Sequence, residues 1–138
     1  MEPILLRAGE TGCAFATDAD GRLHQLGFGP DASSAAPSFP VELYPLAYPT
    51  FGEDPFAFPA LRVTNASGVL STRLVVDGHE SARHDGGDSL RITLVDPGQP
   101  LEVVLALRGW DADGVVEQWV EVTNRQDAPI TLHEVAAA

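Results

Sequence analysis

The sequence is poor in cysteine and contains no lysine. A single cysteine, Cys13, excludes a disulfide within the chain and fits a cytoplasmic protein. All eight basic residues are arginines, placed singly along a chain with 20 acidic residues, and the formal net charge is −12. Nucleic acid and anionic lipid both attract clustered basic faces. We therefore expect neither nucleic acid nor a membrane as a partner.

Long apolar runs are absent as well. No stretch approaches the ~18 consecutive apolar residues that a membrane-spanning helix needs. The first seven residues carry no basic segment and only three consecutive apolar residues, so no signal peptide is expected at this terminus. No window repeats apolar residues at the helical spacing of i, i+3, i+4 and i+7. The 138 residues are nevertheless 44% hydrophobic, which is enough for a core, and we predict that residues 1–138 form a single domain.

Apolar and polar residues alternate with a period of two along three segments, 90–94, 101–108 and 115–124. In the third segment Val116, Val120 and Val122 share one face, whereas Glu117 and Trp119 share the other. This pattern is typical of an antiparallel sheet with one solvated face. We expect Trp119 to be covered by a further layer of the protein, because a large indole is seldom left in solvent.

Shorter strands are predicted between turn signals that recur about every ten residues. They cover residues 4–7, 13–17, 22–28, 60–64, 69–77 and 130–135. The Asp-Gly and Asn-Ala-Ser-Gly turn signals at 18–21, 65–68 and 85–88 separate several of them. We therefore predict an all-β fold, an antiparallel β-sandwich with little or no helix.

One segment, 43–62, does not follow the strand pattern. It contains both tyrosines, three phenylalanines and four of the eleven prolines. Proline cannot donate a hydrogen bond within a sheet and breaks helices, so the segment is expected to be a loop. A loop so rich in aromatic rings must pack against its own domain or against another molecule.

Four pieces of the chain, in order, resemble the amino-terminal β-domain of glycoside hydrolase family 36 α-galactosidases. They are Tyr48–Phe56, Phe58–Val63, Thr72–Glu80 and Val120–Leu132. The resemblance implies a parent enzyme with a large β-sandwich (a supersandwich), a TIM barrel that carries the active site, and a small β-domain. That enzyme would release terminal α-linked galactose from melibiose or raffinose, with retention of configuration. This chain would be the non-catalytic front part of the sandwich, without the barrel.

The resemblance also implies a role for the loop. In many bacterial members the segment that corresponds to Tyr48–Pro59 reaches a neighbouring subunit and helps to wall its sugar pocket. The implied pocket-rim or subunit-interface residues are Tyr48, Phe51, Gly52, Glu53, Asp54 and Phe56. The implied partners are further copies of the parent enzyme and a small oligosaccharide. Family members often read Gly-Asp-Gly-Asp-Phe-Arg-Glu-Pro-Ala here, whereas this chain reads Gly-Glu-Asp-Pro-Phe-Ala-Phe-Pro-Ala, so shape and aromatic packing are expected to persist rather than hydrogen bonding to sugar.

No catalytic residue, metal ligand or cofactor is assigned. Glu53 and Asp54 are adjacent, and neighbours on one turn cannot flank a glycosidic bond as two catalytic carboxylates must. His79 and His84 are five residues apart, whereas the helical zinc motif needs four. The Asp-x-Asp-Gly segments at 18–21 and 111–114 lack the further acids of a calcium loop.

Two other classes of function stay open from the residues alone. The first is a galactose-binding or mutarotase-like sandwich that acts on free sugar through side chains in a sheet concavity. Its nearest candidates are His24, His79, Glu80 and Glu117. The second is a purely structural β-domain that binds no small molecule. Fold alone does not separate these classes, because β-sandwiches serve many functions.

Overall fold

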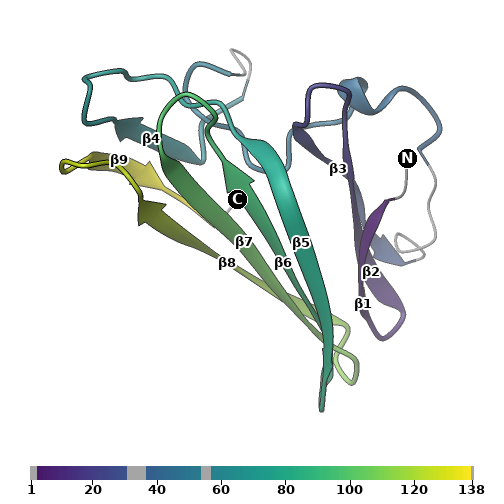
Figure 1. The fold of residues 1–138 in the computed structure, drawn as a ribbon. Helices are drawn as coiled ribbons and strands as arrows, with labels where there is room; N and C mark the ends of the chain where they lie inside the picture. Colours follow the sequence, from purple (N-terminus) through teal and green to yellow (C-terminus); the bar gives the residue numbers. More distant parts are fainter. Residues whose placement is uncertain (1–2, 31–36, 54–56, 138) are drawn as a thin grey trace.

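The computed structural model describes residues 3–30, 37–53 and 57–137, which form nine strands and one turn of 3-10 helix, η2 (Val41–Leu43) (Figure 1). The strands are β1 (Ile4–Ala8), β2 (Thr11–Thr17), β3 (Leu23–Pro30), β4 (Leu61–Thr64), β5 (Val75–His84), β6 (Gly87–Val95), β7 (Leu101–Trp110), β8 (Val115–Asn124) and β9 (Thr131–Val135). All paired strands are antiparallel, so the all-β prediction is confirmed. None of the described residues belongs to a helix long and apolar enough to cross a bilayer.

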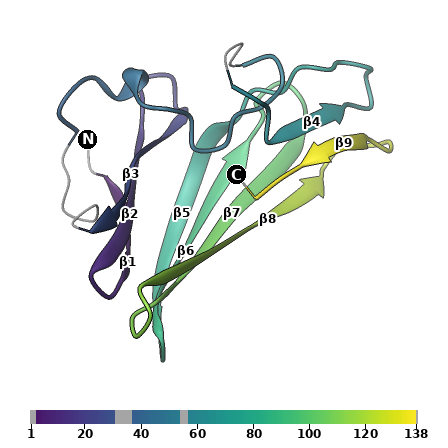
Figure 2. The same cartoon turned by 180° about the vertical axis from the view of Figure 1, so that it is seen from behind.

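The strands form one four-stranded sheet and two smaller ones. The larger sheet has the order β5-β6-β7-β8, and the smaller sheets are β1-β2-β3 and β4-β9. The smaller sheets are linked by the segment after η2, which makes isolated bridges from Leu46 to His24 in β3 and from Thr50 to Leu61 in β4. Figures 1 and 2 show this segment running from the β1-β2-β3 sheet toward β4.

The core lies between the larger sheet and the two smaller ones. Leucine and isoleucine side chains from the inner face of β6 and β7 meet side chains from β1, β2 and β4, which is the packing of a β-sandwich. The fully buried side chains include Leu6, Leu61, Val63, Leu90, Ile92, Leu94, Leu101, Val103, Leu105 and Leu107. The valines at 116, 120 and 122 pack against this core as the period-two pattern predicted.

The prediction for Trp119 was wrong. Its side chain lies on the outer face of the larger sheet and is 41% exposed. No strand among the described residues covers that face, because both smaller sheets pack on the opposite one. The indole Nε1 instead donates to Glu121 Oε2 at 3.2 Å, two residues along the same face.

The predicted strand at 69–77 is also displaced. β5 begins only at Val75 and runs to His84, with a bulge between Val76 and Gly78. The backbone before it follows the aromatic loop rather than a sheet, since the Thr72 amide donates to Phe51 O at 3.1 Å. Local β propensity at Val69 and Leu70 was therefore overridden by a contact with a distant loop.

The β2–β3 hairpin is fixed by a buried carboxylate. Asp18 Oδ1 accepts hydrogen bonds from the amides of Asp20 and Arg22, and its Oδ2 accepts from Arg22 Nε at 2.9 Å and His24 Nε2 at 2.8 Å. His24 Nδ1 in turn lies 2.8 Å from the Tyr44 carbonyl oxygen. The predicted turn is confirmed, and all of its acceptor capacity serves the fold.

Candidate functional site

The aromatic loop 48–59 is held to the sandwich by Tyr48. The Tyr48 ring is buried with 4% of its surface exposed, and its hydroxyl donates to Ala136 O at 2.9 Å. Burial raises the pKa of this phenol to about 12, although the hydrogen bond with Ala136 acts in the opposite direction. The start of the loop is thereby tied to the chain just after β9, 88 residues away.

We expect Tyr48→Phe to lower the free energy of unfolding by about 1 kcal/mol, because it leaves the Ala136 carbonyl without this donor while conserving the ring. Chemical denaturation of both proteins measures the difference. Tyr44→Phe is the matched control, since among the described residues the Tyr44 hydroxyl bonds only to the exposed Ser38, and its loss should change stability by less than about 0.5 kcal/mol. Equal losses for the two variants would contradict the anchoring role.

A tight turn follows the anchor and is set by Gly52. The Glu53 amide donates to Thr50 O at 3.3 Å, and Gly52 has a φ of +92°. A Cβ atom at position 52 would lie 2.7 Å from Ser71 Cβ. Only glycine combines this backbone conformation with this close approach.

The Glu53 side chain folds back onto its own turn. Its Oε2 accepts a hydrogen bond from Thr50 Oγ1 at 3.1 Å, whereas Oε1 is buried without a partner among the described residues. Burial raises the pKa of this carboxyl above its usual range, and the Thr50 hydroxyl together with the charges of Arg22 and Arg73 offsets only part of that effect. Glu53 therefore lies against the protein surface between two arginines and does not extend freely into solvent.

Glu53→Gln is expected to stabilise the chain at neutral pH. The folded-state pKa of Glu53 is raised, so the folded state favours the protonated form, and stability is lost as the pH rises through that pKa. The glutamine variant does not ionise and escapes this loss. Its stability relative to wild type should grow between pH 4 and pH 7, reaching on the order of 1 kcal/mol. Urea denaturation across this range is the measurement, and a constant difference would contradict the burial argument.

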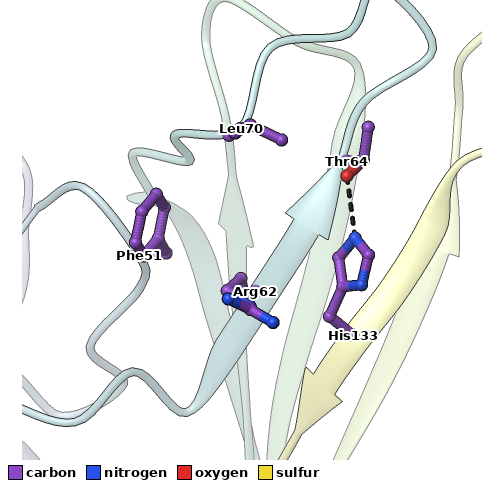
Figure 3. Close-up of a pocket in the computed structure, with 5 residues that line it drawn as sticks. All are labelled: Phe51, Arg62, Thr64, Leu70 and His133. Atoms are coloured by element: carbon purple, nitrogen blue, oxygen red, sulfur yellow. Dashed lines mark hydrogen bonds between the residues drawn. The ribbon is translucent and has the colours of Figure 1, made fainter.

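Two aromatic rings of the loop point outward. Phe51 is 41% exposed and forms one wall of a pocket of about 270 Å³, and Phe58 is 97% exposed. Figure 3 shows Phe51 and Leu70 on one side of this pocket, with Arg62 and Thr64 of β4 and His133 of β9 completing it. Thr64 Oγ1 and His133 Nε2 are 2.8 Å apart. The pocket thus combines an apolar wall with a cation, a hydroxyl and an imidazole.

The predicted site residues that the structure describes fall into two groups, a surface turn and a buried anchor. Phe51, Gly52 and Glu53 form the surface turn, and Tyr48 lies inside, where it anchors that turn. Asp54 and Phe56 lie outside the described residues. Arg62, Thr64 and His133 were missed, because β4 and β9 are far apart in the sequence and only their pairing brings these side chains together.

The residues proposed for a stand-alone sugar-binding domain do not form one cluster. His24 is a buried residue of β3, while His79 lies on the inner side of β5 opposite Ile92. Glu80 and Glu117 lie on the outer face of the larger sheet, on its two edge strands. His79 and His84 fall on opposite faces of β5, as an odd spacing along a regular strand requires.

The family is decided by a comparison with known protein families. The model of the glycosyl hydrolase family 36 N-terminal domain matches residues 15–138. The chain belongs to this family. The predicted resemblance is thereby confirmed, and the all-β architecture agrees with it.

Solved structures of α-galactosidases have a similar fold. The galactosidase domain of the α-galactosidase-sucrose kinase AgaSK superimposes with a TM-score of 0.83 at 21% identity, covering 97% of this chain and 24% of its own. A variant of AgaA from Geobacillus stearothermophilus in complex with raffinose gives 0.79 at 20% identity, covering 97% and 24%. The α-galactosidase from Lactobacillus brevis gives 0.81 at 18%, covering 96% and 23%. The family 36 chain described here thus spans about a quarter of these proteins. No curated protein sequence matches it.

Proposed function

We propose that this chain is the leading β-sandwich segment of a retaining α-galactosidase that hydrolyses terminal α-galactosides of the melibiose and raffinose type. The observation that carries the proposal is the family match over residues 15–138, together with a fold similar to family 36 α-galactosidases over nearly the whole chain. In this proposal the segment is non-catalytic and the catalytic carboxylates belong to a barrel elsewhere in the parent. The parent would be a cytoplasmic homo-oligomer.

The exposed strands β8 and β9 are evidence for a parent protein with a larger sandwich. Every residue of β9 is exposed, and β8, the edge of the larger sheet, leaves Val116, Val120 and Val122 only partly covered. Edge strands with free backbone groups and apolar neighbours accept further strands or aggregate. The next part of the parent chain would pair with these edges and complete the core.

The reading frame that follows residue 138 tests the parent directly. We expect it to continue with more sandwich strands and then a barrel with two carboxylates placed for retaining hydrolysis, about 5–5.5 Å apart. A stop codon at this point, or a catalytic domain of another class, would overturn the proposal. Release of galactose from raffinose by the whole gene product is the matching activity assay.

For the loop we propose a place in the subunit contact and in the wall of a neighbouring active site. Its support is the pair of outward rings, Phe51 and Phe58, on a loop stiffened by proline and anchored by Tyr48. Aromatic side chains are enriched at interfaces, and a stiff segment loses little conformational entropy when it docks. The turn around Gly52 presents Phe51 beside Arg62, so the contact would be mixed rather than purely apolar.

A chimera isolates the role of the loop. Residues 1–138 would replace the matching first quarter of the Lactobacillus brevis α-galactosidase, and Phe51→Ala with Phe58→Ala would then be introduced. We expect kcat/KM for raffinose to fall about tenfold, equal to about 1.4 kcal/mol of transition-state stabilisation, and the oligomer to weaken in light scattering. Phe28→Ala is the control, since Phe28 is 62% exposed on β3, outside the loop. Unchanged activity and assembly in the loop variant would remove this role while leaving the family assignment intact.

A further inference from the structure

The outer face of the larger sheet carries a hollow that the proposed function does not use. It has a volume of about 270 Å³ and is lined by side chains of β6, β7 and β8 and by His84 at the end of β5. Its outward-facing lining residues belong to two cross-strand rows: Arg91, Ala106 and Trp119 in one, and Ser89 and Arg108 in the next. These residues alternate with the core positions, so they share the face that points away from the smaller sheets.

The hollow exists because small residues sit between large ones. Ala106 occupies the centre of its row on β7, with Arg91 on one side and Trp119 on the other. Although Ala106 faces outward it is only 1% exposed, because the longer neighbours overhang it. In the adjacent row Ser89 is a second short side chain, next to Arg108. The result is a floor of short side chains under a rim of long ones.

One side of the rim is an ordered aromatic wall. Trp119 is 41% exposed, and its Nε1 donates to Glu121 Oε2 at 3.2 Å. The same carboxylate accepts two hydrogen bonds from Arg91, Nη1 to Oε2 and Nη2 to Oε1, both at 2.8 Å. The Arg91 pairing lowers the pKa of Glu121, so the carboxylate stays ionised and available as an acceptor. The indole is therefore held in place without being covered.

The other side of the rim carries the guanidinium of Arg108. The guanidinium of Arg108 lies 4.2 Å from the centroid of the Trp110 ring, and Nη2 is 3.3 Å from His84 Nδ1. Glu117 is the residue opposite Arg108 on β8. Its carboxylate accepts a hydrogen bond from Trp110 Nε1 at 2.5 Å rather than pairing with Arg108. Among the described residues Arg108 forms no ion pair. Its Nε has no hydrogen-bond partner but is itself buried, so the donors that Arg108 can offer to a ligand are those of its terminal Nη1 and Nη2.

We propose that this hollow binds one unit of a neutral oligosaccharide. A pyranose ring offers an apolar face of C–H groups, which would stack on the exposed indole of Trp119, and an edge of hydroxyl groups that both donate and accept. The hydroxyls would accept hydrogen bonds from Arg108 and Arg91 and donate to Glu121 or Glu117. A hollow of this size admits a single hexose unit, and the other sugar units of the oligosaccharide would remain in solvent.

The charge of the protein favours a neutral ligand over an anionic one. Arg91 is already neutralised by Glu121, and Glu80 and Glu117 lie on the same face, so only Arg108 remains unpaired. With a formal net charge of −12, the protein as a whole repels phosphates and sugar acids. This hollow is separate from the surface of the proposed loop contact, because it lies on the outer face of the larger sheet, whereas Phe51 lies beside Arg62 of β4 and His133 of β9.

The two tryptophans make this hollow directly observable. Trp110 and Trp119 are the only tryptophans in the chain, so fluorescence excited at 295 nm and the two indole N–H signals in a ¹H–¹⁵N spectrum report on this face alone. We expect raffinose or maltotriose, added to the 138-residue chain, to shift the Trp119 signal in a saturable manner. The dissociation constant should be on the order of 1–10 mM, as expected for one hexose unit.

Variants separate the hollow from the rest of the surface. Ala106→Leu fills the floor while keeping both reporters, and Trp119→Ala removes the stacking wall while keeping Trp110, so each should weaken binding at least tenfold. Phe28→Ala removes an aromatic ring that is 62% exposed on β3, outside both the hollow and the aromatic loop, and should leave the dissociation constant within twofold. Absence of a saturable shift with either neutral sugar would overturn the proposal, as would a shift produced only by digalacturonate.

Discussion

Replacing Asp18 by alanine is expected to lower the free energy of unfolding by about 3 to 5 kcal/mol, the cost of breaking a buried ion pair by removing one partner. The Asp18 side chain is fully buried and accepts four hydrogen bonds. Its loss would leave His24, Arg22 and two backbone amides without their acceptor. Asp20→Ala is the control, because the Asp20 side chain is 67% exposed and lies 4.0 Å from Arg22, so its effect should stay below about 0.5 kcal/mol. Similar losses for the two variants would show that the buried network does not determine this effect.

The contribution of Asp18 should also depend on pH. Burial alone would raise the pKa of Asp18, but the hydrogen bonds from His24 and from the amides of Arg22 and Asp20, with the charge of Arg22, lower it below the usual 3.8. A depressed folded-state pKa gives stability that is complete above the unfolded-state pKa and is lost as the pH falls through the folded-state pKa. The stability difference between wild type and Asp18→Ala should therefore be constant from about pH 5 upward and narrow below about pH 4. Urea denaturation from pH 2.5 to pH 7 measures this, and a difference that grows toward low pH would contradict the assigned sign.

Replacing Gly109 by alanine is expected to cost about 3 kcal/mol, at the upper end of the range for overpacking a core. A Cβ at Gly109 would lie 2.4 Å from Arg7 O and 3.1 Å from Ala8 Cβ, at the point where β1 crosses β7. The backbone oxygen cannot move aside as a flexible side chain would. The two sheets would have to separate, and the packing between β1 and β7 would be lost.

Gly78→Ala is the matched control for Gly109→Ala. Gly78 is also a strand glycine, but a Cβ there would meet nothing within 4 Å and its φ lies outside the left-handed region. We expect its effect to stay within about 0.5 kcal/mol of wild type. Thermal or chemical denaturation of both variants gives the comparison. A Gly109→Ala protein as stable as Gly78→Ala would show that the sheets can shift apart without penalty.

The candidate site was only partly predictable from the sequence. Proline and aromatic content marked 43–62 as a loop, and the structure describes it as one over residues 44–53 and 57–60. The sequence could not separate the inward ring of Tyr48 from the outward rings of Phe51 and Phe58, because a loop has no fixed period that assigns side chains to faces. The partners of Phe51 came from β4 and β9, and no local spacing encodes such a pairing.

The sequence by itself determined the all-β class, the strand segments 90–94, 101–108 and 115–124, and the inward position of alternate residues such as Ile92, Val103 and Leu105, since a period of two follows from backbone geometry alone. Tertiary structure decided the start of β5 at Val75, the exposure of Trp119 and the position of Arg108 over Trp110. The physical reason is the same in each case. Which face of a sheet stays open, and which distant loop a backbone amide bonds to, depend on how whole sheets stack rather than on the residues next in the chain.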